Sequence, residues 1–100
     1  MISLIFILTT IVHIADWLQT RWISKNGKDK GFWETNVFLG TYPSLATVNI
    51  WFVTAFVLLT VLVFNLPFWY GLILVLGWFI VEIYHVISNY KKGIGVLGWS

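Results

Sequence analysis

Four ionisable side chains lie within long apolar stretches of the sequence, where such groups are rare. They are His13, Asp16, Glu82 and His85. A charged group inside a membrane helix costs about 2.5–3.5 kcal/mol on insertion scales, so these residues are candidates for function by default. His13 and Asp16 are three residues apart, and so are Glu82 and His85. In a helix this spacing places both members of a pair on one face, so each stretch presents an acid and an imidazole together.

An acid and an imidazole at this spacing are the ligand types of a divalent metal site. Glu-x-x-His is the pairing used in carboxylate-bridged di-metal bundles, and because the chain has no cysteine, these ligands favour zinc, iron or manganese. A metal ion held there would activate water for hydrolysis. The predicted metal ligands are His13, Asp16, Glu34, Glu82 and His85, with Glu34 and Glu82 as the catalytic carboxyl groups. The residues predicted to bind the cofactor or to orient the substrate are Gln19, Thr20 and Asn36.

Other interpretations of the same residues stay open. Polar side chains commonly hold membrane helices together, at about 0.6 kcal/mol for an average hydrogen bond. A pair between His13 and Glu82, or one between Asp16 and His85, would then neutralise the charges without a metal ion. Alternatively, these groups would pass protons or ions through an assembly of chains. Ser88 lies three residues after His85, but neighbours on one helix rarely align as nucleophile and base, which disfavours a serine hydrolase.

The elements that must position these residues are membrane helices. Of the 100 residues, 59% are hydrophobic and 10% are charged, whereas a soluble domain has about 25% charged residues. Three apolar stretches are long enough to cross a bilayer, which takes about 20 residues, and they span 2–23, 45–65 and 68–90. We therefore predict an all-α membrane protein that forms a single domain, 1–100, with three transmembrane helices. This composition excludes a cytosolic enzyme, a disordered chain and a disulfide scaffold.

The short link between the second and third stretches governs how the helices pack. Asn65-Leu66-Pro67 links them in a connection so short that these two helices must be antiparallel neighbours. The first and third helices then run in the same direction. Counted back from their basic ends at about 1.5 Å per residue, Asp16 and Glu82 lie at about 12 and 13 Å, which is the same depth. The sequence therefore predicts one polar pocket shared by the first and third helices.

All six basic residues fall on one side of the three predicted helices. Arg21 and the lysines of the loop follow the first helix, and Lys91 and Lys92 follow the third. The positive-inside rule places this loop, residues 24–44, and the C-terminus in the cytoplasm and the N-terminus outside. This predicts a multi-pass protein of the inner membrane. Because membrane orientation explains these charges, nucleic acid is not an expected partner.

Two segments outside the helices also carry predictions. Thr41 and Pro43 suit the cap and the first turn of the second helix. The apolar part of the loop, from Phe32 to Gly40, is predicted to lie on the membrane surface. The glycine-rich tail after Lys92 is predicted to be short and interfacial.

The first span ends in a run of polar residues that continues in the loop. It reads Asp16-Trp17-Leu18-Gln19-Thr20, followed by Glu34-Thr35-Asn36 and Gly40. This pattern resembles a group of small, uncharacterised membrane proteins of bacteria and their phages, in which Glu-x-Asn is often followed by proline. Val37 stands where that proline would be. The resemblance covers roughly the first 40 residues. It implies no particular reaction, but it implies that these positions act as a unit: Asp16, Gln19, Thr20, Glu34 and Asn36.

The leading hypothesis is a membrane-embedded metal site that opens to the cytoplasm and hydrolyses a lipid-like or membrane-proximal substrate. The alternative is a non-enzymatic membrane module, either a phage holin-like protein that forms homo-oligomers or a small subunit of a larger membrane complex. Small size favours the alternative, because three helices bury little surface alone. In both hypotheses the lipid bilayer is the immediate partner of the chain.

Overall fold

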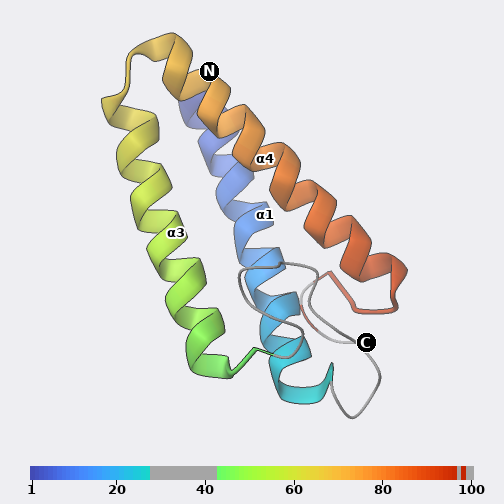
Figure 1. The fold of residues 1–100 in the computed structure, drawn as a ribbon. Coiled ribbons are helices and arrows are strands. Elements are labelled where there is room, and N and C mark those ends of the chain that lie inside the picture. Colours follow the sequence, from blue (N-terminus) through green and yellow to red (C-terminus); the bar gives the residue numbers. More distant parts are fainter. Residues whose placement is uncertain (28–42, 97, 99–100) are drawn as a thin grey trace.

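The computed structural model describes residues 1–27, 43–96 and 98, and these residues form helices joined by turns (Figure 1). The helices are α1 (Ile2–Trp22), its π-helical continuation η1 (Ile23–Gly27), α3 (Leu45–Asn65) and α4 (Phe68–Lys91). No strand occurs in this part of the chain. Three helical stretches are long and apolar enough to cross a membrane, namely Ile2–Asn26, Leu45–Asn65 and Phe68–Lys91. The predicted all-α fold with three such helices is therefore confirmed, with boundaries close to those predicted.

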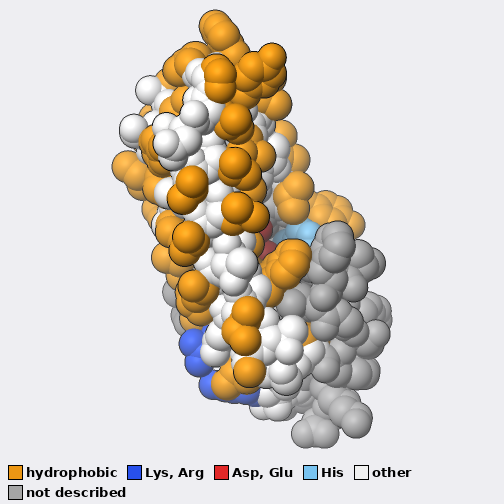
Figure 2. Space-filling model, turned by 60° about the vertical axis from the view of Figure 1, so that its left-hand side comes forward, with side chains coloured by type: hydrophobic (Ala, Val, Ile, Leu, Met, Phe, Trp, Pro, Cys, Tyr) orange, Lys and Arg blue, Asp and Glu red, His pale blue; other side chains and the backbone are white. Residues whose placement is uncertain are grey.

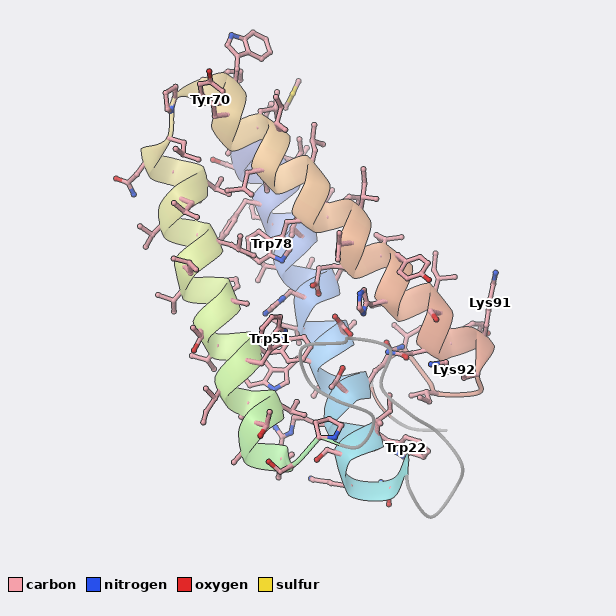
Figure 3. The ribbon with its side chains drawn as sticks, viewed as in Figure 1. Trp22, Trp51, Tyr70, Trp78, Lys91 and Lys92 are labelled. Atoms are coloured by element: carbon pink, nitrogen blue, oxygen red, sulfur yellow. The ribbon has the colours of Figure 1, made fainter. Side chains whose placement is uncertain are left out.

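The three long helices pack as a hairpin with a third helix beside it. α1 contacts both α3 and α4, and it runs in the same direction as α4 (Figure 1). The two helices of the hairpin diverge from the turn that joins them (Figure 1). Lysine and arginine side chains gather at one end of the face shown in Figure 2. In Figure 3, Tyr70 lies near the turn, whereas Trp22, Lys91 and Lys92 lie at the opposite end. The parallel course of α1 and α4 agrees with the prediction from the short link.

The hairpin turn is held by a close approach of the two backbones. The N–H of Leu66 donates to the carbonyl oxygen of Leu62 at 3.0 Å, and the N–H of Gly71 donates to that of Pro67 at 2.9 Å. A side chain at position 71 would collide with the backbone carbonyl of Val63. Glycine is therefore the residue that allows α3 and α4 to touch here, before they diverge.

The start of α3 differs from the prediction. Ser44 caps this helix, and its side-chain oxygen accepts a hydrogen bond from the N–H of Thr47 at 3.2 Å. Serine is among the preferred residues for this role, because its side chain satisfies a free N–H of the first turn. The predicted first-turn residue Pro43 lies before the cap, so that prediction is wrong, and Thr41 lies outside the described residues.

The C-terminal tail folds back onto α1. Ile94 is completely buried, and Gly93 and Gly98 have positive φ angles of 103° and 87°. A side chain at position 98 would collide with the backbone carbonyl of Leu18. Sequence alone predicts an interfacial tail, and the structure adds that this tail packs against the bundle.

Two small apolar clusters lie toward the two ends of the bundle. Val63, Val75 and Trp78 form the cluster near the turn, and Val48 and Phe52 form the other. Many other large apolar side chains on the three helices are exposed, as expected of helices that face lipid. The buried polar side chains, in contrast, lie where the helices meet, which makes the interior of the bundle the place to look for a site.

Candidate functional site

His13 of α1 joins all three long helices. Its Nε2 atom lies 3.0 Å from the carbonyl oxygen of Phe52 on α3, and its Nδ1 atom lies 3.3 Å from Oε2 of Glu82 on α4. Because a carbonyl oxygen can only accept, Nε2 carries a hydrogen and donates it to this bond. Of the two pairs considered from the sequence, the structure brings His13 and Glu82 to ion-pair distance.

Aromatic rings surround the imidazole of His13. The ring centroids of Phe52, Phe56 and Trp78 lie 5.1, 5.6 and 5.6 Å from that of His13. Aromatic rings pack favourably at these separations. Phe52 and Phe56 come from α3 and Trp78 comes from α4. Together with the hydrogen bond to α3, these contacts hold the imidazole in one orientation.

Three polar atoms around this imidazole have no hydrogen-bond partner in the part of the chain that the structure describes. They are Nδ1 of His13, Oε2 of Glu82 and Nε1 of Trp78. These residues are only 3, 8 and 6% exposed, respectively, so bulk water does not supply the missing partners. His13 and Glu82 lie within ion-pair distance, but their atoms do not align as a hydrogen bond. A buried polar group without a partner costs about 1–3 kcal/mol. Nε1 of Trp78 is in this position within the described residues, beside a close but poorly aligned pair of His13 with Glu82, and this combination indicates a candidate ligand-binding site.

These atoms belong to side chains that line a groove between α3 and α4. The groove has a volume of about 410 Å³, within the range of about 300–1,000 Å³ that is usual for small-molecule sites. Most of its lining is apolar, including Leu59, Ile73 and Leu74. Trp51 and Trp78 both line it and lie between the hairpin helices in Figure 3. Figure 2 shows acidic and histidine side chains in a hollow between apolar ones.

Gly77 of α4 leaves one wall of the groove open. A side chain added at this position would meet no atom within 4 Å. Glycine inside a helix costs about 1 kcal/mol relative to alanine. α4 therefore gives up some helix stability at a point where the groove gains space.

Asp16, Thr20 and His85 extend the polar region along α1 and α4. Asp16 is 3% exposed and accepts a hydrogen bond at 3.3 Å from Oγ1 of Thr20, which is fully buried. Asp16 and His85 both line the groove, as His13 and Glu82 do. The structure therefore brings these four ionisable residues to one groove, as their matching depth predicts. Their predicted roles as metal ligands or catalytic groups stay predictions.

Gln19 and Asn89 form a second polar cluster where α1 meets α4, which we call the brace. Nε2 of Gln19 donates to the carbonyl oxygens of Val86 and Gly95 at 3.4 and 3.3 Å. Its Oε1 accepts from Nδ2 of Asn89 at 3.2 Å, and both side chains are completely buried. Both polar atoms of the Gln19 side chain thus have partners in the protein, which is the arrangement of a residue that holds elements together. The cofactor-binding roles predicted for Gln19 and Thr20 stay predictions.

The residues that the structure describes contain part of the predicted metal site. They include no group of three or more His, Cys, Asp or Glu side chains that could hold a metal ion. The predicted ligand Glu34 and the predicted orienting residue Asn36 lie outside the described residues. The separation of His13 and Glu82, 3.3 Å, nevertheless suits two ligands of one ion, because the ligands of tetrahedral zinc with bonds of about 2.1 Å lie about 3.4 Å apart.

Three features of the groove are not among the predicted site residues. Trp78 lies four residues before Glu82, so helical spacing places it on the same face and was a usable signal. Gly77 interrupts an apolar run, which was a second signal. The backbone carbonyl group of Phe52 could not be singled out from the sequence, because every residue has a backbone carbonyl group. Only the fold decides which of them lies beside His13.

Comparison of the chain with models of known protein families, with curated proteins and with solved structures found no match. The resemblance based on the patterns at residues 16–20 and 34–36 therefore stays a prediction. The groove and the three helices that are long and apolar enough to cross a membrane are the features that bear on function.

Proposed function

We propose that the protein binds a lipid-like molecule in the groove between α3 and α4. The observation that carries this proposal is a set of polar atoms at His13, Trp78 and Glu82 that make no hydrogen bond within the described residues and whose side chains line a mostly apolar groove. A molecule with an apolar chain and one small polar group matches both parts of this lining. Since the three helices are long and apolar enough to cross a membrane, lipids are the molecules that surround them.

The proposed location is the inner membrane, with the N-terminus outside and the C-terminus in the cytoplasm. The support is the position of the basic residues: Arg21 ends α1, and Lys91 and Lys92 end α4, at the same end of the bundle. A cytoplasmic excess of lysine and arginine is the usual determinant of orientation. The end of the hairpin where α3 and α4 stand apart then faces the cytoplasm.

We extend the proposal to metal-dependent hydrolysis of an ester in the bound molecule. Nδ1 of His13 and Oε2 of Glu82 would hold a divalent ion between them, with Asp16, His85 and Glu34 as the proposed further ligands. Such an ion lets bound water act as a nucleophile at neutral pH and polarises the ester carbonyl. Water supplies the hydroxyl group to the acyl carbon and a proton to the leaving alcohol oxygen, so the products are a fatty acid and an alcohol.

The binding proposal is tested with a lipid that carries a photoactivatable group on its acyl chain. The wild-type protein is reconstituted in vesicles that contain this lipid, and the cross-linked peptides are identified by mass spectrometry. We expect cross-links to α3 and α4 along the groove, and at least a tenfold loss in Gly77→Leu, whose side chain fills open space. The control is Ile80→Phe, which adds volume to α4 at a residue that is 65% exposed. Equal cross-linking in Gly77→Leu and wild type would remove the proposal.

The hydrolysis proposal is tested by metal content and by fatty acid release. Purified protein equilibrated with zinc should retain stoichiometric metal, and Glu82→Gln and His85→Ala should retain less. If the wild type holds no stoichiometric metal, or if both variants hold as much metal as the wild type, the metal proposal is wrong. The proposal that the groove binds a lipid would still stand. If expression instead permeabilises cells at a defined time, and Glu82→Gln leaves that effect intact, the non-enzymatic holin-like alternative is favoured.

A further inference from the structure

We infer that the bound molecule carries an uncharged headgroup with both a hydroxyl and a carbonyl oxygen, as a diacylglycerol does, and that the indole N–H of Trp78 donates a hydrogen bond to it. This inference rests on the proposed function, because it names the class of lipid that the groove takes. Its support comes from the hydrogen-bonding capacity, the charge and the depth of the groove lining.

The indole of Trp78 sets the first requirement. Its Nε1–H group can only donate, and it has no acceptor within the described residues although the residue is 6% exposed. Tryptophan in a buried position usually finds a partner for this group. A ligand that fills the groove must therefore offer an oxygen acceptor at this point, and an ester carbonyl is the acceptor that most lipids carry.

The acidic residues set the second requirement. The carboxyl groups of Asp16 and Glu82 both line the groove, and no lysine or arginine is found among the described residues that line it. When no metal ion is bound, a phosphate headgroup placed there would meet the like charge of these carboxyl groups. A hydroxyl group, in contrast, can donate to Oε2 of Glu82 or to Nδ1 of His13, the two other atoms that lack a hydrogen bond.

Depth in the membrane gives the same answer. Glu82 precedes Lys91, the last residue of α4, by nine residues, which corresponds to about 13 Å along the helix. The hydrocarbon core of a bilayer is about 30 Å thick, so the carboxyl group lies well inside it when Lys91 is at the interface. Moving a charged phosphate from the interface into the hydrocarbon core has a high free-energy cost, and the cost is lower for an uncharged glycerol ester.

The apolar part of the groove fits the rest of such a lipid. Leu59, Ile73 and Leu74 line the groove on the side of the hairpin turn. Along α4, Gly77 lies between Leu74 and Glu82, and it leaves space beside the helix backbone. A lipid bound with its glycerol end near Trp78 and Glu82 would therefore have room for an acyl chain toward the turn.

The test compares two photoactivatable lipids with the same acyl chains, a diacylglycerol and a phosphatidylglycerol, at equal content in vesicles that contain the full-length protein. We expect the diacylglycerol to cross-link in the groove at least tenfold more than the phosphatidylglycerol. Trp78→Phe, which removes the N–H and keeps an aromatic ring, should lower the cross-linking of the diacylglycerol in the groove at least threefold. Trp69→Phe makes the same change at a position that is 70% exposed, and it should leave this cross-linking unchanged.

The outcomes separate the inference from the proposed function. Equal cross-linking of both lipids in wild type, or a higher yield with phosphatidylglycerol, overturns the inference without requiring that any variant folds. Unchanged cross-linking of the diacylglycerol in Trp78→Phe overturns the role of the indole. If Gly77→Leu still abolishes cross-linking in either case, lipid binding in the groove stands. If Gly77→Leu has no effect on either lipid, the proposed function falls as well.

Discussion

The brace lies where α1 meets α4 and the groove lies between α3 and α4, and the two polar regions differ in how their polar atoms are paired. In the brace, both polar atoms of the Gln19 side chain have protein partners on α4 or in the tail. In the groove, polar atoms of His13, Trp78 and Glu82 are buried and lack hydrogen bonds within the described chain. Satisfied polar groups stabilise a membrane bundle, whereas unsatisfied ones reduce its stability and are retained for another reason. Oδ1 of Asn89 also lacks a hydrogen bond within the described residues, so the contrast rests on Gln19, whose two polar atoms are both bonded, and on the larger number of unbonded atoms in the groove.

The largest stability change is expected in the brace. Gln19→Ala removes three hydrogen bonds of about 0.6 kcal/mol each, so the free energy of unfolding should fall by at least about 1.8 kcal/mol. The buried cavity left behind adds to this loss. Unfolding in mixed detergent micelles measures the change, and lipid cross-linking in the groove should stay within twofold of wild type. Unchanged stability with lost cross-linking would instead support the ligand-binding role that the sequence predicts for Gln19.

A smaller loss is expected where the tail meets α1. Gly98→Ala forces a side chain onto a residue with a φ of 87° and against the carbonyl group of Leu18. The left-handed backbone alone costs about 1–2 kcal/mol for a residue other than glycine. The same unfolding assay measures this loss, with Val96→Ala, a change at a partly exposed position of the tail, as control. A loss no greater than that of the control would show that the tail contributes little to the brace.

The smallest change in stability is expected in the groove. Oε2 of Glu82 lies 3.3 Å from Nδ1 of His13 but makes no hydrogen bond in the described chain. Glutamine keeps a polar group of the same size beside the imidazole, so Glu82→Gln should alter the free energy of unfolding by less than about 0.6 kcal/mol, the value of one average bond. Ligand cross-linking or metal content should change in this variant although stability does not. A loss as large as that of Gln19→Ala would mean that the pair of His13 with Glu82 is a second brace.

The fold and the approximate position of the site were predictable from the sequence. Long apolar stretches define helices whatever their partners, and the link at Asn65–Pro67 leaves only one way for its two helices to pack. With α1 and α4 parallel, equal distances from their basic ends place Asp16 and Glu82 at one level. Periodicity and counting are sufficient for these conclusions, because both depend only on helix geometry.

The division of the polar residues between brace and groove was not predictable. Gln19 and His13 are both polar residues of the first apolar stretch, and helical spacing places both on its polar face. Their difference depends on which backbone carbonyls lie opposite, since Gln19 meets those of Val86 and Gly95 and His13 meets that of Phe52. These contacts arise from the crossing of helices and from the return of the tail, and a single sequence contains no local signal for either.

The contact between Gly71 and the backbone of Val63 has a mechanical consequence. Because α3 and α4 touch at this point and separate beyond it (Figure 1), the hairpin works as a wedge with its apex at position 71. Spreading the apex by the width of one methyl group would shift the far ends of both helices by leverage. The spacing between Trp51 and Trp78 is thus governed from the turn end of the hairpin, where a glycine sets how far apart the two helices begin.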